Sequence, residues 1–81
     1  MNRKLLKVNR LLMWANVREF DDGLRLRLPR NDWQQLNFDN YERLRVVVSG
    51  QAVMWLRVAA MREWPPNVVI TLTNRAAFVP E

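Results

Sequence analysis

Residues 24–28 alternate leucine with arginine, and this alternation restricts the fold more than any other feature of the 81-residue chain. Because successive side chains of a strand point to opposite faces, the three leucines would share one face, and Arg25 and Arg27 the other. Such alternation is typical of an antiparallel strand with one buried and one solvated face. Pro29 lacks the N–H that a ladder needs, so we expect the strand to end there.

A turn signal precedes this strand. Asp21-Asp22-Gly23 lies between two apolar segments, and Asp-Gly in that position favours a hairpin. We therefore expect residues 15–20 to pair with residues 24–28. A divalent-ion or acid–base role for the two aspartates is the alternative, and turn chemistry explains them more simply.

Ser49-Gly50 predicts a second, tight hairpin between the apolar runs 44–48 and 52–58. Both faces of this hairpin are largely apolar, so it should be central or buried against a second copy. A helix over residues 51–62 is the alternative, because Ala59, Ala60 and Met61 favour helix. The break at Pro65-Pro66 would end either element.

Residues 1–14 carry only basic charges and predict an amphipathic helix. Leu5, Val8, Leu12 and Ala15 would form its apolar stripe. A strand over residues 11–20 competes with this interpretation, because the same residues are apolar enough for either.

The remaining elements are a short helix over residues 33–38 and a last strand over residues 68–73. Asn31 or Asp32 would cap the helix, and Trp33 and Leu36 would hold it against the sheet. The predicted fold is a single α+β domain over residues 1–81. It comprises an N-terminal helix (1–14), a β-rich core of about five strands in a sheet or barrel (15–73) with the short central helix, and a tail (74–81).

The chain is basic, with 13 Lys and Arg against 8 Asp and Glu and a net charge of +5. Eleven of the thirteen are arginine, whose planar fork of donors fits phosphates and carboxylates. This balance favours an anionic partner, which could be nucleic acid, an acidic protein or a membrane surface.

Several classes of function are excluded or disfavoured by composition. There is no Cys and no His, which removes thiol nucleophiles, histidine acid–base chemistry and Cys-based zinc sites. Two glycines cannot build the Gly-rich phosphate motifs. We therefore expect no catalytic residues, no metal and no cofactor, and a protein that is not an enzyme. No apolar run approaches the roughly 20 residues of a membrane span, so we expect a cytoplasmic, soluble protein without one.

The candidate nucleic-acid contacts are arginines near the first predicted strand. Arg25 and Arg27 lie about 7 Å apart on one strand face, close to the spacing of successive phosphates, and Arg30 lies just beyond. A second set of contacts would be Arg3, Lys7 and Arg10. For Arg25 and Arg27, the alternative is a solvated face on which the arginines pair with acids of a neighbouring strand. For the second set, the alternative is the polar face of a helix that docks on the rest of the protein.

The chain has four tryptophans, which are many for its length. Tryptophan is enriched in interaction hot spots, although it also fills the cores of small proteins. We predict a protein interface that includes Trp55, Trp64, Val47 and Val53.

The order strand, short helix, turn and hairpin in LRLRLPRNDWQQLNFDNYERLRVVVSGQAVMWL resembles the swapped-hairpin module of AbrB-type transition-state regulators and SymE-type toxins. The resemblance covers about 33 of the 81 residues. It implies an intertwined homodimer that contacts DNA through arginines at the positions of Arg25, Arg27 and Arg30. The chain departs from the module in lacking a glycine in the turn before the second hairpin.

Two functions follow as hypotheses. The first is a small basic regulator of transcription that binds DNA, as a homodimer, through arginines on one sheet face. The second is an accessory protein of the kind that phages and mobile elements encode, which binds and modulates a host protein complex.

Overall fold

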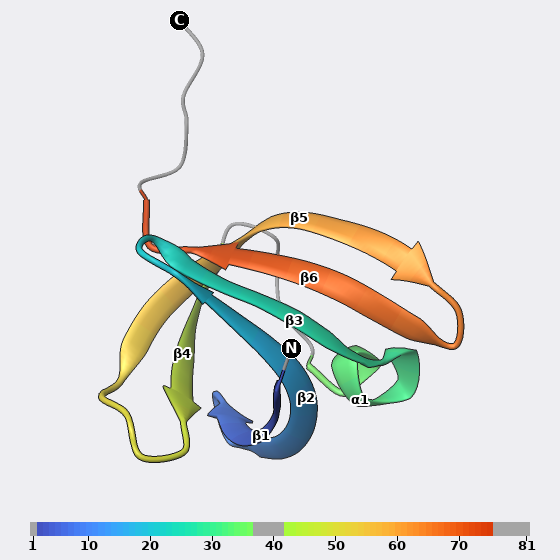
Figure 1. Ribbon diagram of the computed structural model, residues 1–81, viewed down its shortest axis with the longest axis horizontal. Coiled ribbons are helices and arrows are strands. Elements are labelled where there is room, and N and C mark those ends of the chain that lie inside the picture. The colour runs from blue at the N-terminus through green and yellow to red at the C-terminus, as the bar shows by residue number, and fades with distance from the viewer. Residues whose placement is uncertain (1, 37–41, 76–81) are drawn as a thin grey trace, which may run out of the picture.

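The chain folds mainly into strands. The computed structural model describes residues 2–36 and 42–75 (Figure 1). The described residues form six strands and the short helix α1: β1 (Asn2–Val8), β2 (Leu11–Phe20), β3 (Gly23–Pro29), α1 (Arg30–Gln34), β4 (Arg43–Val48), β5 (Met54–Trp64) and β6 (Asn67–Thr73). The fold is therefore nearly all-β, and the predicted α+β class with an N-terminal helix is wrong.

The strands pair antiparallel in the order β1-β2-β3-β6-β5-β4, and β4 pairs with β1 to close a barrel. The closing ladder joins Leu6 to Val48 and Val8 to Val46. All of these strands belong to one chain, so the barrel is complete without a strand from a second copy.

The N-terminal segment shows why the predicted helix is wrong. Leu6 is 1% exposed and Val8 is fully buried, whereas Leu12, assigned to the apolar stripe of the helix, is 69% exposed. As a strand, β1 pairs along its whole length with β2, and residues 6–8 also pair with β4 on the other edge. The strand that competed with the helix over residues 11–20 is present as β2.

The hairpin of β2 and β3 forms as predicted. Its register runs from Phe20 opposite Gly23 to Asn16 opposite Arg27. Gly23 is required here by close approach, because a Cβ at this position would lie 1.9 Å from the backbone oxygen of Leu72 on β6.

Residues 54–64 form a strand, so the alternative helix over residues 51–62 is wrong. The amide of Gln51 donates to the carbonyl of Val48 at 2.9 Å, which closes a turn at Ser49-Gly50. Pairing of β4 with β5 begins only at Val46 and Met54, so the connection is longer than the predicted tight turn.

The hairpin of β5 and β6 extends beyond the closed part of the barrel (Figure 1). β4 pairs with β5 only as far as Arg57, and a bulge follows between Val58 and Ala60. Within the described residues, the rest of β5 pairs with β6 alone. This extension continues the outer surface of the sheet past the barrel itself.

Helix α1 packs against β3 and β6 near this extension. It has five residues, follows Pro29 and has no side-chain cap, so both the two-turn helix and its predicted Asn31 or Asp32 cap are wrong. Trp33 and Leu36 are buried, as expected. Residues 37–41 and 76–81, which include the end of the predicted helix and most of the predicted tail, lie outside the described residues.

The interior is filled by alternate residues of every strand. Its largest fully buried side chains are Leu6, Leu24, Leu26, Leu28, Leu44, Leu56, Ile70, Leu72, Val8, Val46, Val48 and Val68. Because these apolar residues fix the inward face, the residues between them are held on the outer surface.

Candidate nucleic-acid interface

The outer face of β3 carries Arg25 and Arg27, both half-buried, as the alternation predicts. Arg25 lies opposite Arg18 on β2 and Thr71 on β6. Arg27 lies between Asn16 on β2 and Val69 on β6. No acid is registered opposite either arginine, so the alternative in which neighbouring strands neutralise them does not apply.

A row of residues in register crosses five strands of this surface. It runs Arg3, Asn16, Arg27, Val69 and Arg62, on β1, β2, β3, β6 and β5 in turn. Four strand spacings of about 4.8 Å give the row a length of about 19 Å along the curved surface of the sheet. The row therefore places a guanidinium at each end and one in the middle.

Three aromatic side chains lie beside these arginines. Trp14 is 50% exposed, Phe20 is 40% exposed and Trp64 is 54% exposed. The guanidinium carbon of Arg3 is 5.3 Å from the centroid of Trp14, and that of Arg62 is 5.4 Å from the centroid of Trp64. Each end of the row thus combines a cation with an accessible ring.

Phe20 lies between two cations. The guanidinium carbons of Arg18 and Arg25 are each 5.3 Å from its ring centroid. Arg18 and Arg25 are also directly opposite each other in the ladder. Like charges in that relation repel each other, and the ring that they share offsets this repulsion while leaving both positive charges in place.

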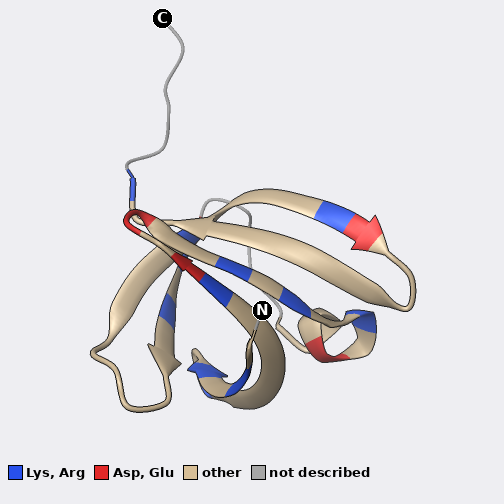
Figure 2. Ribbon diagram, in the orientation of Figure 1, with Lys and Arg blue, Asp and Glu red and all other residues tan. Residues whose placement is uncertain are grey.

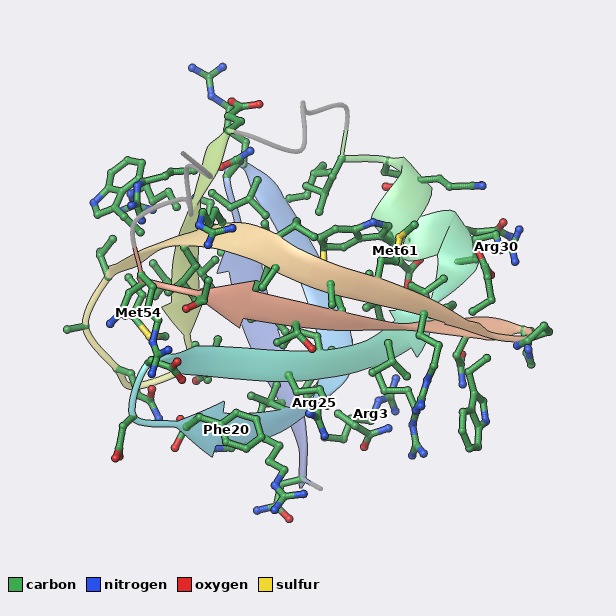
Figure 3. All side chains as sticks on the ribbon, turned by 90° about the horizontal axis from the view of Figure 1, so that it is seen from above. Arg3, Phe20, Arg25, Arg30, Met54 and Met61 are labelled. Carbon is green, nitrogen blue, oxygen red and sulfur yellow. The ribbon has the colours of Figure 1, made fainter. Side chains whose placement is uncertain are left out.

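We call this surface the basic aromatic face, defined by Arg3, Trp14, Arg18, Phe20, Arg25, Arg27, Arg62 and Trp64. Figure 2 shows the basic positions of β2 and β3 close together at its centre. In Figure 3, Arg3, Phe20 and Arg25 lie on one side of the molecule, while Met61 lies on the side of α1.

Glu19, Asp22 and Glu63 pair with cations outside this face. Lys4 is 4.0 Å from Glu19, Arg75 is 3.0 Å from Asp22, and Arg30 pairs with Glu63. No ion pair among the described residues uses an arginine of the basic aromatic face. Its positive charge is therefore available to an external anion.

A hollow of about 160 Å³ opens on the face between β3, β6 and β5. Its lining comprises Arg25, Arg27, Arg62, Trp64 and Val69. Three guanidiniums therefore border one hollow, without an acid among its described lining residues. The Nε atom of Arg27 is buried and has no hydrogen-bond partner within the described part of the chain.

Only some of the predicted nucleic-acid contacts lie on the basic aromatic face. Arg3, Arg25 and Arg27 lie on the basic aromatic face. Lys7 is exposed on β1 but lies opposite Leu12 and Val47, toward β4, and Arg10 is exposed in the turn between β1 and β2. Arg30 lies apart from Arg25, as the first residue of α1, and pairs with Glu63 (Figure 3).

The four residues of the predicted protein interface do not lie together either. Trp55 is 56% exposed and lies opposite Arg45, while Val47 and Val53 flank the last registered pair of β4 and β5. Trp64 is at the far end of β5, about 30 Å away along the strand. It belongs to the basic aromatic face instead.

Sequence reasoning missed Arg18, Phe20 and Arg62 as members of the face. A usable signal was present, because Arg18 and Phe20 are two residues apart in one strand and Arg62 and Trp64 are two apart in another. The assignment of residues 51–62 as a strand was needed before the second pair could be recognised.

Comparison with protein-family models, with curated proteins and with solved structures finds no match. The resemblance to AbrB-type and SymE-type proteins therefore stays a prediction. Within the described residues, no helix has the length and apolar character of a membrane span.

Proposed function

We propose that this chain is a small basic protein that binds nucleic acid, with DNA as the first candidate, across its basic aromatic face. The proposal describes a binding protein that regulates rather than catalyses, located in the cytoplasm. That the protein forms a homodimer stays a prediction. Light scattering with and without DNA would measure its oligomeric state.

The observation that carries the proposal is the opposed pair Arg18 and Arg25. Two like charges face each other across a ladder, with no acid of the described chain to offset them. The Phe20 ring attracts both guanidiniums and holds them together, but it leaves their positive charge uncompensated. A cluster of uncompensated positive charge on an accessible sheet face favours the binding of an anion.

The test is binding of a labelled oligonucleotide at a series of salt concentrations. Three to five phosphate contacts predict that affinity falls by roughly one to three orders of magnitude between 50 and 200 mM salt. The control is the variant in which Arg18, Arg25 and Arg27 are all changed to glutamine, which should bind weakly at every salt concentration. Affinity that is independent of salt, or equal in the variant, would contradict the proposal.

A second candidate function has its own surface. Trp55 and Val53, which is 43% exposed, form an apolar area near β4 that is separate from the basic aromatic face. Exposed aromatic residues of this kind are typical of protein-binding hot spots. This candidate requires a stoichiometric protein complex that survives nuclease and moderate salt and is lost in Trp55→Ala.

A further inference from the structure

The exposed rings of the basic aromatic face could stack on unpaired bases, but not on the bases of a duplex. In a duplex the faces of the bases are hidden within the stack, and a protein contacts the phosphates and the edges of the bases instead. Proteins that bind single strands combine a positively charged track with aromatic side chains on which bases stack. We propose that the basic aromatic face binds single-stranded nucleic acid, an inference that rests on the proposed function.

The two tryptophans lie at matching positions relative to the row of arginines. Trp14 is two residues from Asn16 on β2, and Trp64 is two residues from Arg62 on β5. The antiparallel register places both on the same side of the row, toward the end of β3 that precedes α1. The tryptophans therefore form a second row, about 7 Å from the first.

The dimensions of the two rows fit a short extended strand. Along the curved sheet, Trp14 and Trp64 are three strand spacings apart, about 14 Å, and the terminal arginines of the row are four spacings apart, about 19 Å. Successive phosphates of one strand are about 6–7 Å apart when extended. The face thus accommodates about three to four nucleotides, with phosphates along the arginine row and bases toward the tryptophan row.

The middle of this path is the hollow between β3, β6 and β5. The hollow is bordered by Arg25, Arg27 and Arg62, so a phosphate there would meet guanidiniums from β3 and β5. Charge-assisted hydrogen bonds from guanidinium to phosphate are among the strongest in proteins. The central phosphate and the flanking rings would then engage the same strand.

The outer ring faces remain accessible. Arg3 covers one face of Trp14, and Arg62 covers one face of Trp64. Both indoles are still about half exposed, at 50% and 54%. A base can therefore stack on the open side of each indole, with the guanidinium behind it adding positive charge.

The experiment compares one labelled 15-nucleotide DNA strand of mixed sequence with the same strand annealed to its complement, and with RNA of the same sequence. The expected result is at least tenfold tighter binding of the single strand than of the duplex. Tighter binding of either single-stranded DNA or RNA supports the inference, and the ratio between them identifies the natural source.

The variants separate stacking from charge. Trp14→Ala and Trp64→Ala should each weaken single-strand binding about 5- to 100-fold, as expected for loss of one base stack, with duplex binding changed less than twofold. Trp64→Phe should keep most of the affinity. Trp55→Ala is the matched control, because Trp55 is equally exposed but lies off the face, and it should change neither affinity.

Equal or tighter binding of the duplex would overturn the inference, as would tryptophan variants that lose both forms of DNA equally. Duplex binding that depends on the arginines but not on the tryptophans would leave the proposed function standing. Failure to bind any nucleic acid would remove both proposals. Circular dichroism of each variant confirms that the barrel is folded, and the exposed positions of both tryptophans make this the expected result.

Discussion

The guanidinium of Arg3 lies over the indole of Trp14, with 5.3 Å between its carbon and the ring centroid. The two residues are diagonal neighbours across the ladder of β1 and β2, in which Arg3 is opposite Asn16 and Trp14 is opposite Leu5. In the predicted helix, Arg3 and Trp14 would have been about three turns apart. Strand pairing therefore creates this contact, and with it one end of the basic aromatic face.

The first prediction tests β1 as a core strand. Leu6→Ala should lower the free energy of unfolding by about 2–5 kcal/mol, because the side chain is 1% exposed in the barrel interior. Leu12→Ala should change it by no more than about 0.5 kcal/mol, because Leu12 is 69% exposed. Denaturant unfolding of both variants provides the measurement. A larger loss for Leu12 would instead favour the amphipathic helix.

The second prediction concerns the close approach at Gly23. Gly23→Ala should cost about 3 kcal/mol or more, because the new Cβ would lie 1.9 Å from the backbone oxygen of Leu72 and the ladder would have to move. Gly50→Ala is the control. Gly50 has a φ of 79° but open space around it, so only the backbone conformation should cost free energy, about 1–2 kcal/mol. Equal costs in thermal or denaturant unfolding would argue against the packing of β3 on β6.

The third prediction distinguishes arginines on the basic aromatic face from one that is already neutralised. Arg25→Gln and Arg27→Gln should each weaken oligonucleotide binding and reduce the slope of log affinity against log salt by about 1. Arg30→Gln should change the affinity by less than either, because Arg30 pairs with Glu63 beside α1. Salt titrations of the three variants measure this order. An effect of Arg30→Gln as large as that of Arg27→Gln would move the binding site toward α1.

The fourth prediction separates stability from binding at the opposed arginines. Arg18→Thr should change the free energy of unfolding by no more than about 1 kcal/mol, because loss of a like charge directly opposite Arg25 is offset by loss of the cation–π contact with Phe20. The same substitution should weaken nucleic-acid binding. Arg10→Thr in the β1–β2 turn is the control and should leave stability nearly unchanged. A larger loss of stability together with weaker binding in Arg18→Thr would assign Arg18 a structural role.

The parts of the fold that could be predicted are those encoded by neighbouring residues. The β2–β3 hairpin follows from Asp21-Asp22-Gly23 and from the alternation that comes after it. The last strand follows from the β-branched run of β6. The N-terminal strand could not be predicted with the same security, because Leu5 and Val8 fit a helical period as well as Leu6 and Val8 fit a strand. Its partner β4 lies nearly 40 residues away, beyond the reach of local periodicity.

The candidate site divides along the same line. The sequence by itself determined that Arg25 and Arg27 share a solvated strand face, because alternating leucines leave them no other. Only the tertiary structure decided that Arg3, Arg18 and Arg62 lie on the same surface, with Trp14 and Trp64 beside them. It also decided that Arg30 lies away from this surface and pairs with Glu63. The physical reason is that period-two alternation sets the face of each side chain within its own strand, whereas the order and register of strands around a closed barrel decide which faces adjoin.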